Sequence, residues 1–288
     1  MNTFSHLEHK AQLLRRTVLR MCIGAGTGHV TSSFSCVELL VALYYGGILR
    51  HDPKNPGWEN RDRFILSKGQ ASPILYAVLC DRGFFPKTWL KTFCKKNGRF
   101  GVHLQHDVPG VEVTTGSLGY GLGIGAGMAL AARLNRQPFL IFVLLGDGEC
   151  HEGSVWETAM FAGHQELNNL VAIVDRNWLC ATDFTENCVR LNPLERKWRA
   201  FGWDVRSIDG HSFPHIFKAL SGLRLRERNQ PLAIIANTVK GKGIDFMENQ
   251  PLWHGIAPQG KEAREALACL KKIIRTEKKG ENDINYNA

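Results

Sequence analysis

Apolar and polar residues follow one another along the chain in blocks that predict strands and helices in turn. Residues 139–145 and 170–174 are short, continuous apolar runs, as expected for strands buried on both faces. Residues 154–167 between them are amphipathic, and Ser154 with Glu157 forms the capping-box pattern of a helix start. This order of strand, helix and strand predicts an α/β fold with a three-layer, doubly wound, mostly parallel sheet.

The rest of the chain continues this alternation. Further strands are expected at residues 63–67, 203–208 and 232–239, and helices at residues 5–21, 35–48, 71–81, 86–96, 193–201, 213–226 and 262–272. His29 opens a polar loop that runs to Ser33, where a histidine most often bonds a backbone carbonyl. No internal repeat or linker interrupts the pattern, so we expect one domain over residues 1–275 and a polar tail at 276–288.

Residues 116–127 carry glycine at nearly every second position, which would make a poor strand. Read as a helix, the segment places Gly119, Gly123 and Gly127 on one face, where another backbone can approach closely. Gly116, at the entrance of this helix, is placed to offer backbone N–H groups to a phosphate. Tight helix packing alone explains the glycines equally well, and both explanations can hold.

One oxygen-bearing side chain follows each of the two central strands. Asp147 lies in a Gly-Asp-Gly turn after the first strand, and Asn177 follows the second. If the strands are parallel neighbours, both side chains converge at the carboxyl edge of the sheet, where open α/β sheets bind ligands. An acid and an amide are hard oxygen ligands that suit Mg²⁺ on a phosphate. Taken alone, however, Asp-Gly after a strand is ordinary turn chemistry.

Charge and cysteine usage narrow the partners. The 288-residue chain has a net charge of +9, which favours anionic partners, and phosphorylated metabolites fit better than nucleic acid because no strong basic arm exists. Eight scattered cysteines without a C-x-x-C pair indicate reduced thiols. Residues 113–132 lack charge but are too rich in glycine for a membrane span, and no signal core is seen. We therefore expect a cytoplasmic protein without membrane contact.

Five motifs in order resemble those of the transketolase family. They are Gly28-His29, Leu-Ser-Lys-Gly at 66–69, Pro-Gly-Val-Glu-Val-Thr-Thr-Gly-Ser-Leu-Gly at 109–119, Gly-Asp-Gly-x-x-x-Glu-Gly at 146–153 and Trp-His-Gly at 253–255. The turn at Asp147, followed about thirty residues later by Asn177, resembles the thiamine-diphosphate signature. The resemblance implies the fold of a diphosphate-binding (PP-type) domain, with thiamine diphosphate and Mg²⁺ as cofactors.

The resemblance also assigns site residues. It implies that Asp147, Asn177 and the backbone carbonyl of Leu179 hold Mg²⁺. It implies a cofactor-binding set of Gln70, Gly116, Leu118, Gly146, Asp147, Gly148, Glu152 and Asn177. In the family, the glutamate matched by Glu152 lies at a subunit contact that links paired cofactor sites; an acid at a helix N-terminus is the simpler alternative.

The implied reaction is the transfer of a two-carbon ketol unit from a ketose or ketose phosphate to an aldehyde, with the cofactor as electron sink. His29, His103 and His254 match the family histidines that move protons to and from sugar hydroxyls. The resemblance covers only the amino-terminal half of a transketolase. It therefore implies the N-terminal subunit of a split enzyme, inactive without a C-terminal subunit that carries the pyrimidine-binding domain and the activating glutamate, in an α2β2 heterotetramer.

Three departures from the family pattern favour a specialised reaction in sugar or secondary metabolism. Gln70 stands where the family usually has histidine, Leu104 where it has proline, and Tyr120 where it has glutamine, all expected near the cofactor or donor channel. Two alternatives stay open. One is a decarboxylating synthase or acyloin-forming subunit that uses the same cofactor, and the other is a non-catalytic cofactor-binding assembly subunit.

Overall fold

The computed structural model describes residues 4–224 and 229–270, and its centre is a five-stranded parallel sheet in the order β1-β2-β3-β5-β4. The strands are β1 (Arg63–Leu66), β2 (Ile141–Gly146), β3 (Leu170–Arg176), β4 (Asp204–Asp209) and β5 (Leu232–Asn237). Every pairing between neighbouring strands is parallel. All residues of β2 and β3 are buried, as their continuous apolar runs predict.

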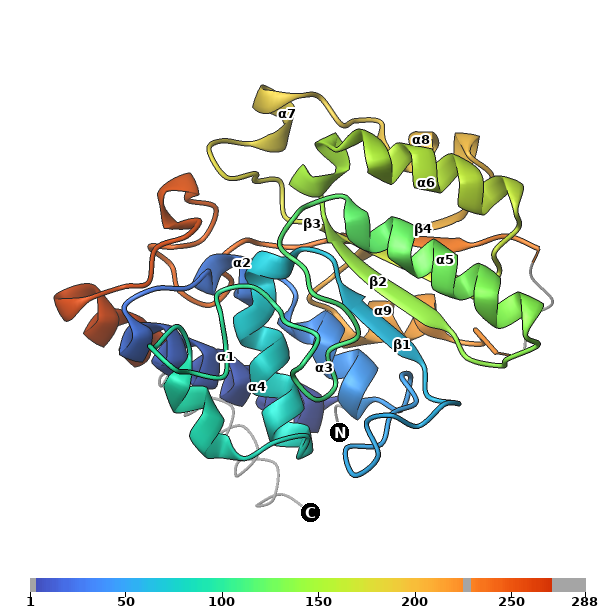
Figure 1. The fold of residues 1–288 in the computed structure, drawn as a ribbon. Coiled ribbons are helices and arrows are strands. Elements are labelled where there is room, and N and C mark those ends of the chain that lie inside the picture. Colours follow the sequence, from blue (N-terminus) through green and yellow to red (C-terminus); the bar gives the residue numbers. More distant parts are fainter. Residues whose placement is uncertain (1–3, 225–228, 271–288) are drawn as a thin grey trace, which may run out of the picture.

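Helices cover both faces of this sheet, which confirms the doubly wound three-layer fold (Figure 1). On one face lie α1 (Ser5–Ala25), α2 (Val30–Phe34), α3 (Val37–Tyr45), α4 (Ser72–Arg82) and α9 (Phe213–Leu220); on the other lie α5 (Tyr120–Leu134), α6 (Gly153–His164) and α8 (Leu194–Ala200). Short elements complete the chain: α7 (Thr185–Cys188) and the 3-10 helices η1 (Gly69–Ala71), η2 (Lys87–Thr92), η3 (Gly148–His151) and η4 (Pro251–Trp253). Residues 260–270 are also helical.

The core consists of two apolar clusters, one on each face of the sheet. Successive residues of a strand enter opposite clusters: Phe142 and Leu144 pack with α1, α3 and α4, whereas Val143 and Leu145 pack with α5 and α6. Gly125 of α5 lets this helix lie close to the sheet, because a Cβ there would come within 2.6 Å of the Val143 side chain. This packing holds the carboxyl ends of β2 and β3 in place.

Several predicted elements are wrong in kind or length. Residues 30–33, expected as a loop, are helical and buried in α2, where the Thr31 hydroxyl donates to the Trp253 carbonyl at 2.9 Å. The helix expected at 86–96 is only the 3-10 turn η2, because the chain takes positive φ at Cys94 and Asn97. The helix expected at 213–226 ends at Leu220 as α9, and residues 225–226 lie outside the described residues.

The start of α6 also differs from its prediction. The helix begins at Gly153 with Glu152 at the N-cap, and no side chain caps it, so the expected capping box of Ser154 and Glu157 is wrong. The predicted tail at 276–288 and the last residues of the predicted domain, 271–275, lie outside the described residues. No described helix is long and apolar enough to cross a membrane.

Candidate active site

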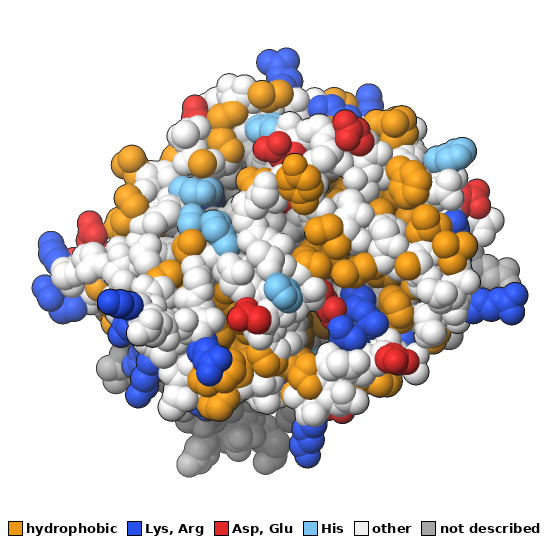
Figure 2. Space-filling view, in the orientation of Figure 1, with side chains coloured by type: hydrophobic (Ala, Val, Ile, Leu, Met, Phe, Trp, Pro, Cys, Tyr) orange, Lys and Arg blue, Asp and Glu red, His pale blue; other side chains and the backbone are white. Residues whose placement is uncertain are grey.

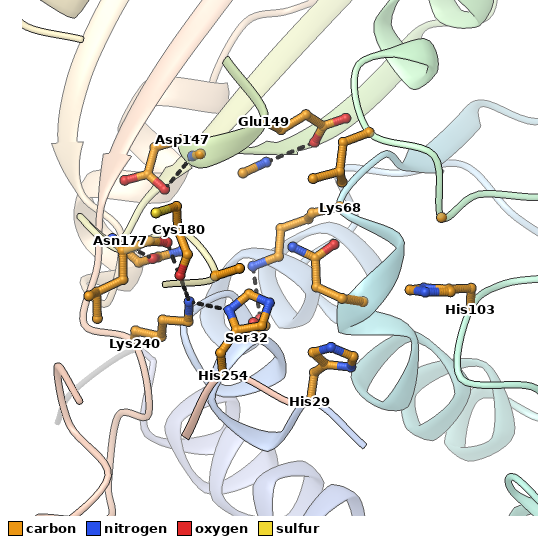
Figure 3. Close-up of a pocket in the computed structure, with 17 residues that line it drawn as sticks. His29, Ser32, Lys68, His103, Asp147, Glu149, Asn177, Cys180, Lys240 and His254 are labelled. Carbon is orange, nitrogen blue, oxygen red and sulfur yellow. Dashed lines mark hydrogen bonds between the residues drawn. The ribbon is translucent and has the colours of Figure 1, made fainter. Parts of the chain in front are cut away.

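A cavity of about 280 Å³ lies at the carboxyl ends of β2 and β3. Figure 3 shows side chains from both halves of the chain pointing into it. Its lining comprises His29, Ser32, Lys68, Gln70, His103, Gly116, Leu118, Gly146, Asp147, Gly148, Glu149, Asn177, Leu179, Cys180, Ala181, Lys240 and His254. The structure thus brings together every site residue expected from the sequence except Glu152.

Asp147 is fixed by three donors at the start of η3. Its Oδ1 accepts from the Gly148 N–H at 2.9 Å, and its Oδ2 accepts from the Trp178 N–H at 2.6 Å and the Arg176 guanidinium at 3.1 Å. Burial raises the pKa of Asp147 to about 6, although Arg176 beside it acts in the opposite direction. A cation bound in the cavity would therefore favour the ionised form of this buried acid.

Asn177 and Leu179 add an amide oxygen and a backbone oxygen next to Asp147. The Asn177 amide donates to Asp175 Oδ2 at 3.1 Å, while its Oδ1 accepts from the Leu179 N–H at 3.2 Å. The Leu179 carbonyl accepts from the Lys240 ammonium at 3.3 Å, so it already faces a positive charge. Carboxylate, amide and carbonyl oxygens at one spot are a donor set that suits Mg²⁺.

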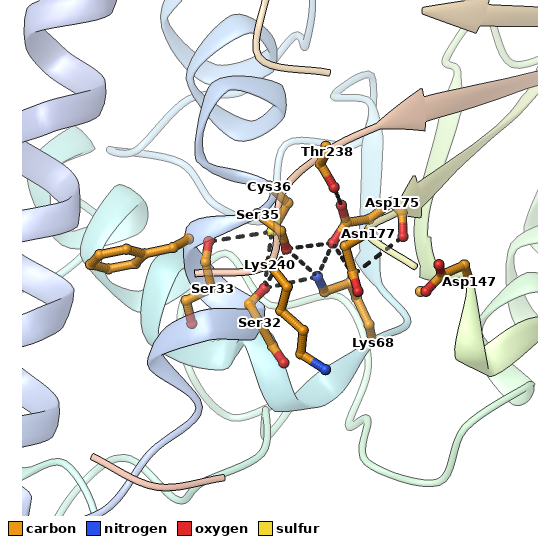
Figure 4. Close-up of polar contacts among 12 residues, drawn as sticks. Ser32, Ser33, Ser35, Cys36, Lys68, Asp147, Asp175, Asn177, Thr238 and Lys240 are labelled. Carbon is orange, nitrogen blue, oxygen red and sulfur yellow. Dashed lines mark hydrogen bonds and ion pairs between the residues drawn. The ribbon is translucent and has the colours of Figure 1, made fainter. Parts of the chain in front are cut away.

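A buried ion pair behind these ligands was not predicted from the sequence. Asp175, the penultimate residue of β3, forms an ion pair with Lys68 and accepts from the hydroxyls of Ser35, at 2.6 Å, and Thr238 (Figure 4). Burial alone lowers the pKa of Lys68, but the Asp175 carboxylate outweighs burial and raises it. The same contacts hold the pKa of Asp175 below its usual value against the effect of burial. Asn177 is thereby held by a charged, fully bonded cluster.

Glycines give the cavity its room. Gly116 has φ +142°, and a Cβ there would meet the His103 ring at 3.0 Å; on Gly148 a Cβ would meet Cys180 at 3.1 Å. Gly116 lies in a loop before α5, which begins only at Tyr120, so its expected place at the helix entrance is wrong. The buried Glu149 carboxylate ties this loop to the sheet, because it accepts from Gly119 N–H at 2.9 Å and Gly146 N–H at 3.1 Å.

Three histidines from distant segments meet on the other side of the cavity. The ring centroid of His29 lies 5.3 Å from that of His254 and 6.2 Å from that of His103. Burial, with His103 and two lysines nearby, lowers the pKa of His29 to about 4; burial and Lys240 lower that of His254 to about 3. Both rings are therefore neutral near pH 7 and able to accept protons from a bound hydroxyl group.

Lys240 links the two sides of the cavity. Its ammonium lies 2.8 Å from His254 Nδ1 and donates to the carbonyls of Leu179 and Cys180 (Figure 3). Burial and the charge of Lys68 lower the pKa of Lys240 to about 8. The sequence offered one signal for this residue, the Lys-Gly-Lys-Gly run after the last strand, but an ordinary glycine turn explained that run as well.

Buried polar atoms without partners indicate that the cavity is built for a polar ligand. His29 Nδ1, His103 Nδ1 and Thr115 Oγ1 find no hydrogen-bond partner among the described residues. His29 therefore does not bond a backbone carbonyl through Nδ1, as a purely structural loop histidine would. Buried groups of this kind are rare unless a ligand or water satisfies them.

Two residues expected near the cofactor lie outside the cavity. Glu152, at the N-cap of α6, is exposed to solvent. Tyr120 at the start of α5 is 63% exposed and does not line the cavity, so its expected place in the donor channel is wrong. Both lie on the outer surface near α5 and α6, which fits a contact with another chain better than a contact with the cofactor.

Comparison with known proteins identifies the family. Residues 8–272 match the description "Transketolase, thiamine diphosphate binding domain". The chain belongs to the transketolase family. The solved transketolase of Campylobacter jejuni subsp. jejuni superposes with a TM-score of 0.85 at 32% identity, over 94% of this chain and 43% of that chain. The fold and the thiamine-diphosphate-binding character of the domain are thus confirmed.

The relatives also separate two kinds of transketolase. The chain is 41% identical to the 6-deoxy-6-sulfo-D-fructose transketolase subunit SqwG of Clostridium sp. (strain MSTE9), over 92% of this chain and 96% of that relative. It is 37% identical to one subunit of the apulose-4-phosphate transketolase of Actinobacillus succinogenes, over 93% and 97%. Human transketolase is 37% identical, but only 43% of its length is covered. The chain therefore groups with the N-terminal subunits of split transketolases.

Proposed function

We propose that this chain is the N-terminal, diphosphate-binding subunit of a two-chain, cytoplasmic transketolase. It moves a two-carbon ketol unit from a ketose or ketose phosphate to an aldehyde. The observation that carries this proposal is the single cavity in which Asp147, Asn177 and the three histidines converge. The family match and the orphaned polar atoms of His29, His103 and Thr115 support it.

Asp147, Asn177 and the Leu179 carbonyl would hold Mg²⁺ against the diphosphate of thiamine diphosphate. When bound, this cofactor supplies an electron sink for the two-carbon fragment. The loop at Gly116 and Leu118 would accommodate the diphosphate, since the absence of a Cβ at Gly116 leaves room beside His103. Lys240 donates to the Leu179 carbonyl and holds this ligand in position.

The histidines would carry the proton transfers. A neutral His29 accepts a proton from a substrate hydroxyl, and His103 and His254 border the same space. Lys240 donates to His254 Nδ1, which leaves the Nε2 of the neutral ring as its N–H group. Gln70 lines the cavity but cannot act as an acid or base, so it can only orient a bound ligand through hydrogen bonds.

A partner chain would complete the cavity. Figure 2 shows hydrophobic side chains gathered over α5 and α6, next to the hollow with the histidines. Large apolar side chains exposed on α5, on α6 and around the cavity include Tyr120, Ile124, Met160, Phe161, Trp178, Phe184, Leu252 and Ile256. An apolar surface of this kind is typical of an interface. The expected partner is a C-terminal subunit with the pyrimidine-binding domain and its activating glutamate, in an α2β2 assembly.

The substrate is expected to be a specialised sugar or sugar phosphate. The two split relatives are named for 6-deoxy-6-sulfo-D-fructose and apulose-4-phosphate, and neither compound is a common ketose of central metabolism. Gln70 in the cavity, where the family usually has histidine, supports a donor other than that of the housekeeping enzyme.

The test is reconstitution with a candidate C-terminal subunit, Mg²⁺ and thiamine diphosphate. Ketoses and aldehydes are supplied in pairs, and mass spectrometry detects aldehydes lengthened by two carbons. We expect ketol transfer only when both chains are present, at a 2:2 ratio by light scattering. Turnover by this chain alone at the rate of the mixture would contradict the proposal.

One alternative is favoured by Gln70 alone: a decarboxylating synthase or acyloin-forming subunit that uses the same cofactor. Release of CO₂ from a 2-keto acid by the reconstituted complex, without ketol transfer, would establish it. A non-catalytic assembly role predicts that Asp147→Ala leaves the turnover of the complex intact. The proposed function predicts that this variant loses turnover.

A further inference from the structure

Two free cysteines lie against the candidate metal site. Cys180 follows Leu179 directly and lines the cavity, and Cys188 ends α7 at the protein surface. Their Sγ atoms are 3.0 Å apart, although the residues are eight positions apart in the sequence. Four other cysteines, Cys22, Cys36, Cys80 and Cys150, are buried, so this pair differs from the core thiols of the chain.

The backbone brings the two thiols together. Leu179 and Phe184 form an antiparallel bridge, and the Cys180 N–H donates to the Asp183 carbonyl at 3.0 Å. The Thr185 N–H, at the start of α7, donates to the Trp178 carbonyl at 2.9 Å. The segment therefore folds back on itself, and this hydrogen-bonded frame sets the distance between the sulfur atoms.

Cys180 is also in contact with the parts of the site that would hold the metal and the diphosphate. Its carbonyl accepts from the Lys240 ammonium at 3.0 Å, and the same ammonium reaches the Leu179 carbonyl (Figure 3). Its Cβ lies 3.1 Å from where a Cβ on Gly148 would be, so it packs directly on the turn that follows Asp147. A displacement of Cys180 must therefore move a candidate metal ligand, or a neighbour of one.

A soft-metal site does not explain the pair. Within residues 4–224 and 229–270, no group of three His, Cys, Asp or Glu side chains could hold a metal ion. Two thiols without a third ligand, one of them exposed, suit oxidation to a disulfide better than zinc binding.

We propose that Cys180 and Cys188 form a reversible redox switch that lowers the affinity of the site for Mg²⁺ and thiamine diphosphate. The oxidant is a peroxide. The exposed Cys188 sulfur attacks one peroxide oxygen, the O–O bond breaks, and a sulfenic acid and water are formed from hydrogen peroxide. The Cys180 sulfur then attacks the Cys188 sulfur and expels the sulfenic oxygen as a second water. Two thiols lose two electrons in total, and a dithiol reductant reverses the step.

The effect on the site follows from the geometry. An S–S bond is about 2.0 Å long, so the sulfur atoms must approach by about 1 Å. This draws Cys180 towards α7 and weakens its contacts with Lys240 and Gly148. The effect on cofactor affinity rests on the proposed function, whereas the formation of the disulfide does not.

The test uses the full chain, reduced or treated with one equivalent of hydrogen peroxide. Peptide mapping without reductant detects the disulfide, and hydrogen exchange follows the Gly148 and Trp178 amides, which both donate to Asp147. Calorimetry gives the affinity for thiamine diphosphate with Mg²⁺. We expect a peptide linked through Cys180 and Cys188, faster exchange at both amides and an affinity lowered about tenfold, as for lost support of a metal ligand. A dithiol should restore all three.

Two variants sharpen the test. Cys188→Ser should keep its affinity after one equivalent of peroxide, whereas Cys269→Ser, which changes a partly exposed cysteine elsewhere, should lose affinity as the unaltered chain does. The absence of a linked peptide, or a linked peptide with unchanged exchange and affinity, would overturn the proposal. If the reduced chain binds no cofactor but the disulfide still changes exchange at Gly148 and Trp178, the proposed function fails and the redox pair stands.

Discussion

On one side of the cavity, Asp147 and Asn177 sit directly on the ends of two central strands; on the other, His29, His103 and His254 come from three separate segments. The first side is buried and bonded throughout, with three donors on Asp147 alone. The second side is held mainly by ring contacts and leaves buried nitrogens of His29 and His103 unpaired. The sheet thus fixes the ligands of the diphosphate side, whereas the histidine side is left for a substrate to complete.

The largest effect is expected where the rigid side is anchored. Lys68→Met removes the cation of the Lys68 and Asp175 pair, whose side chains are 1% and 0% exposed, and leaves a buried carboxylate uncompensated. We expect the free energy of unfolding in urea to fall by about 3 to 5 kcal/mol. The matched control is Lys10→Met, since the pair of Lys10 and Asp81 is 29% and 33% exposed and should cost less than about 1 kcal/mol. Equal losses in both variants would contradict the comparison.

The next effect concerns the metal ligand itself. Asp147→Asn keeps a side chain of the same shape but removes the charge that binds the cation. We expect the Mg²⁺-dependent affinity for thiamine diphosphate, measured by calorimetry, to fall at least about a hundredfold, more than the loss of a supporting residue costs. Asp209→Asn is the control, because Asp209 also ends a strand of this sheet but lies outside the cavity. Retained affinity in Asp147→Asn would remove the basis of the metal site.

A smaller effect is expected on the histidine side. His29→Asn should change the affinity for thiamine diphosphate with Mg²⁺ by less than about threefold and the free energy of unfolding by less than about 1 kcal/mol. The reason is that the His29 ring touches neither Asp147 nor Asn177 and gains little from its neighbours. The same variant should lower the rate of ketol transfer in the reconstituted complex. A loss of affinity as large as that of Asp147→Asn would mean that the two sides are not separable.

The smallest effect is a change of protonation without a change of fold. Burial and Lys240 hold the pKa of His254 near 3, below its usual 6.5, so the ring should stay neutral in the folded chain at pH 6. Because the unfolded chain binds this proton more readily, the stability that His254 contributes is present above about pH 6.5 and is lost as the pH falls towards 3. NMR titration of labelled histidine should find the low midpoint. Lys240→Gln should raise it; an unchanged midpoint would show that the lysine has no part.

The same contrast explains what the sequence could and could not predict. Asp147 and Asn177 were predicted to converge because a parallel neighbour pairing follows from the local strand, helix, strand pattern, and the register of β2 with β3 confirms it. The meeting of His29 with His254 depends on contacts between segments more than 200 positions apart, such as the Thr31 hydroxyl on the Trp253 carbonyl. No local pattern encodes these contacts, and only the family resemblance pointed to them.

Other features were missed for a related reason. Lys68 and Asp175 form the anchor of the rigid side, but a lysine after one strand and an aspartate near the end of another have no local signature of an ion pair. Polar residues 30–33 were predicted to be a loop, because burial among other polar groups cannot be seen in a hydrophobic pattern. The contact between Cys180 and Cys188 likewise arises from the fold of one short segment.

The most direct test of the central claim is a crystal structure of the chain with Mn²⁺ in place of Mg²⁺ and with thiamine diphosphate. The account predicts one anomalous peak at the cavity, about 2.2 Å from oxygens of Asp147, Asn177 and the Leu179 carbonyl, with the diphosphate completing the coordination. A peak elsewhere, or a bound diphosphate with no metal between it and Asp147, would contradict it.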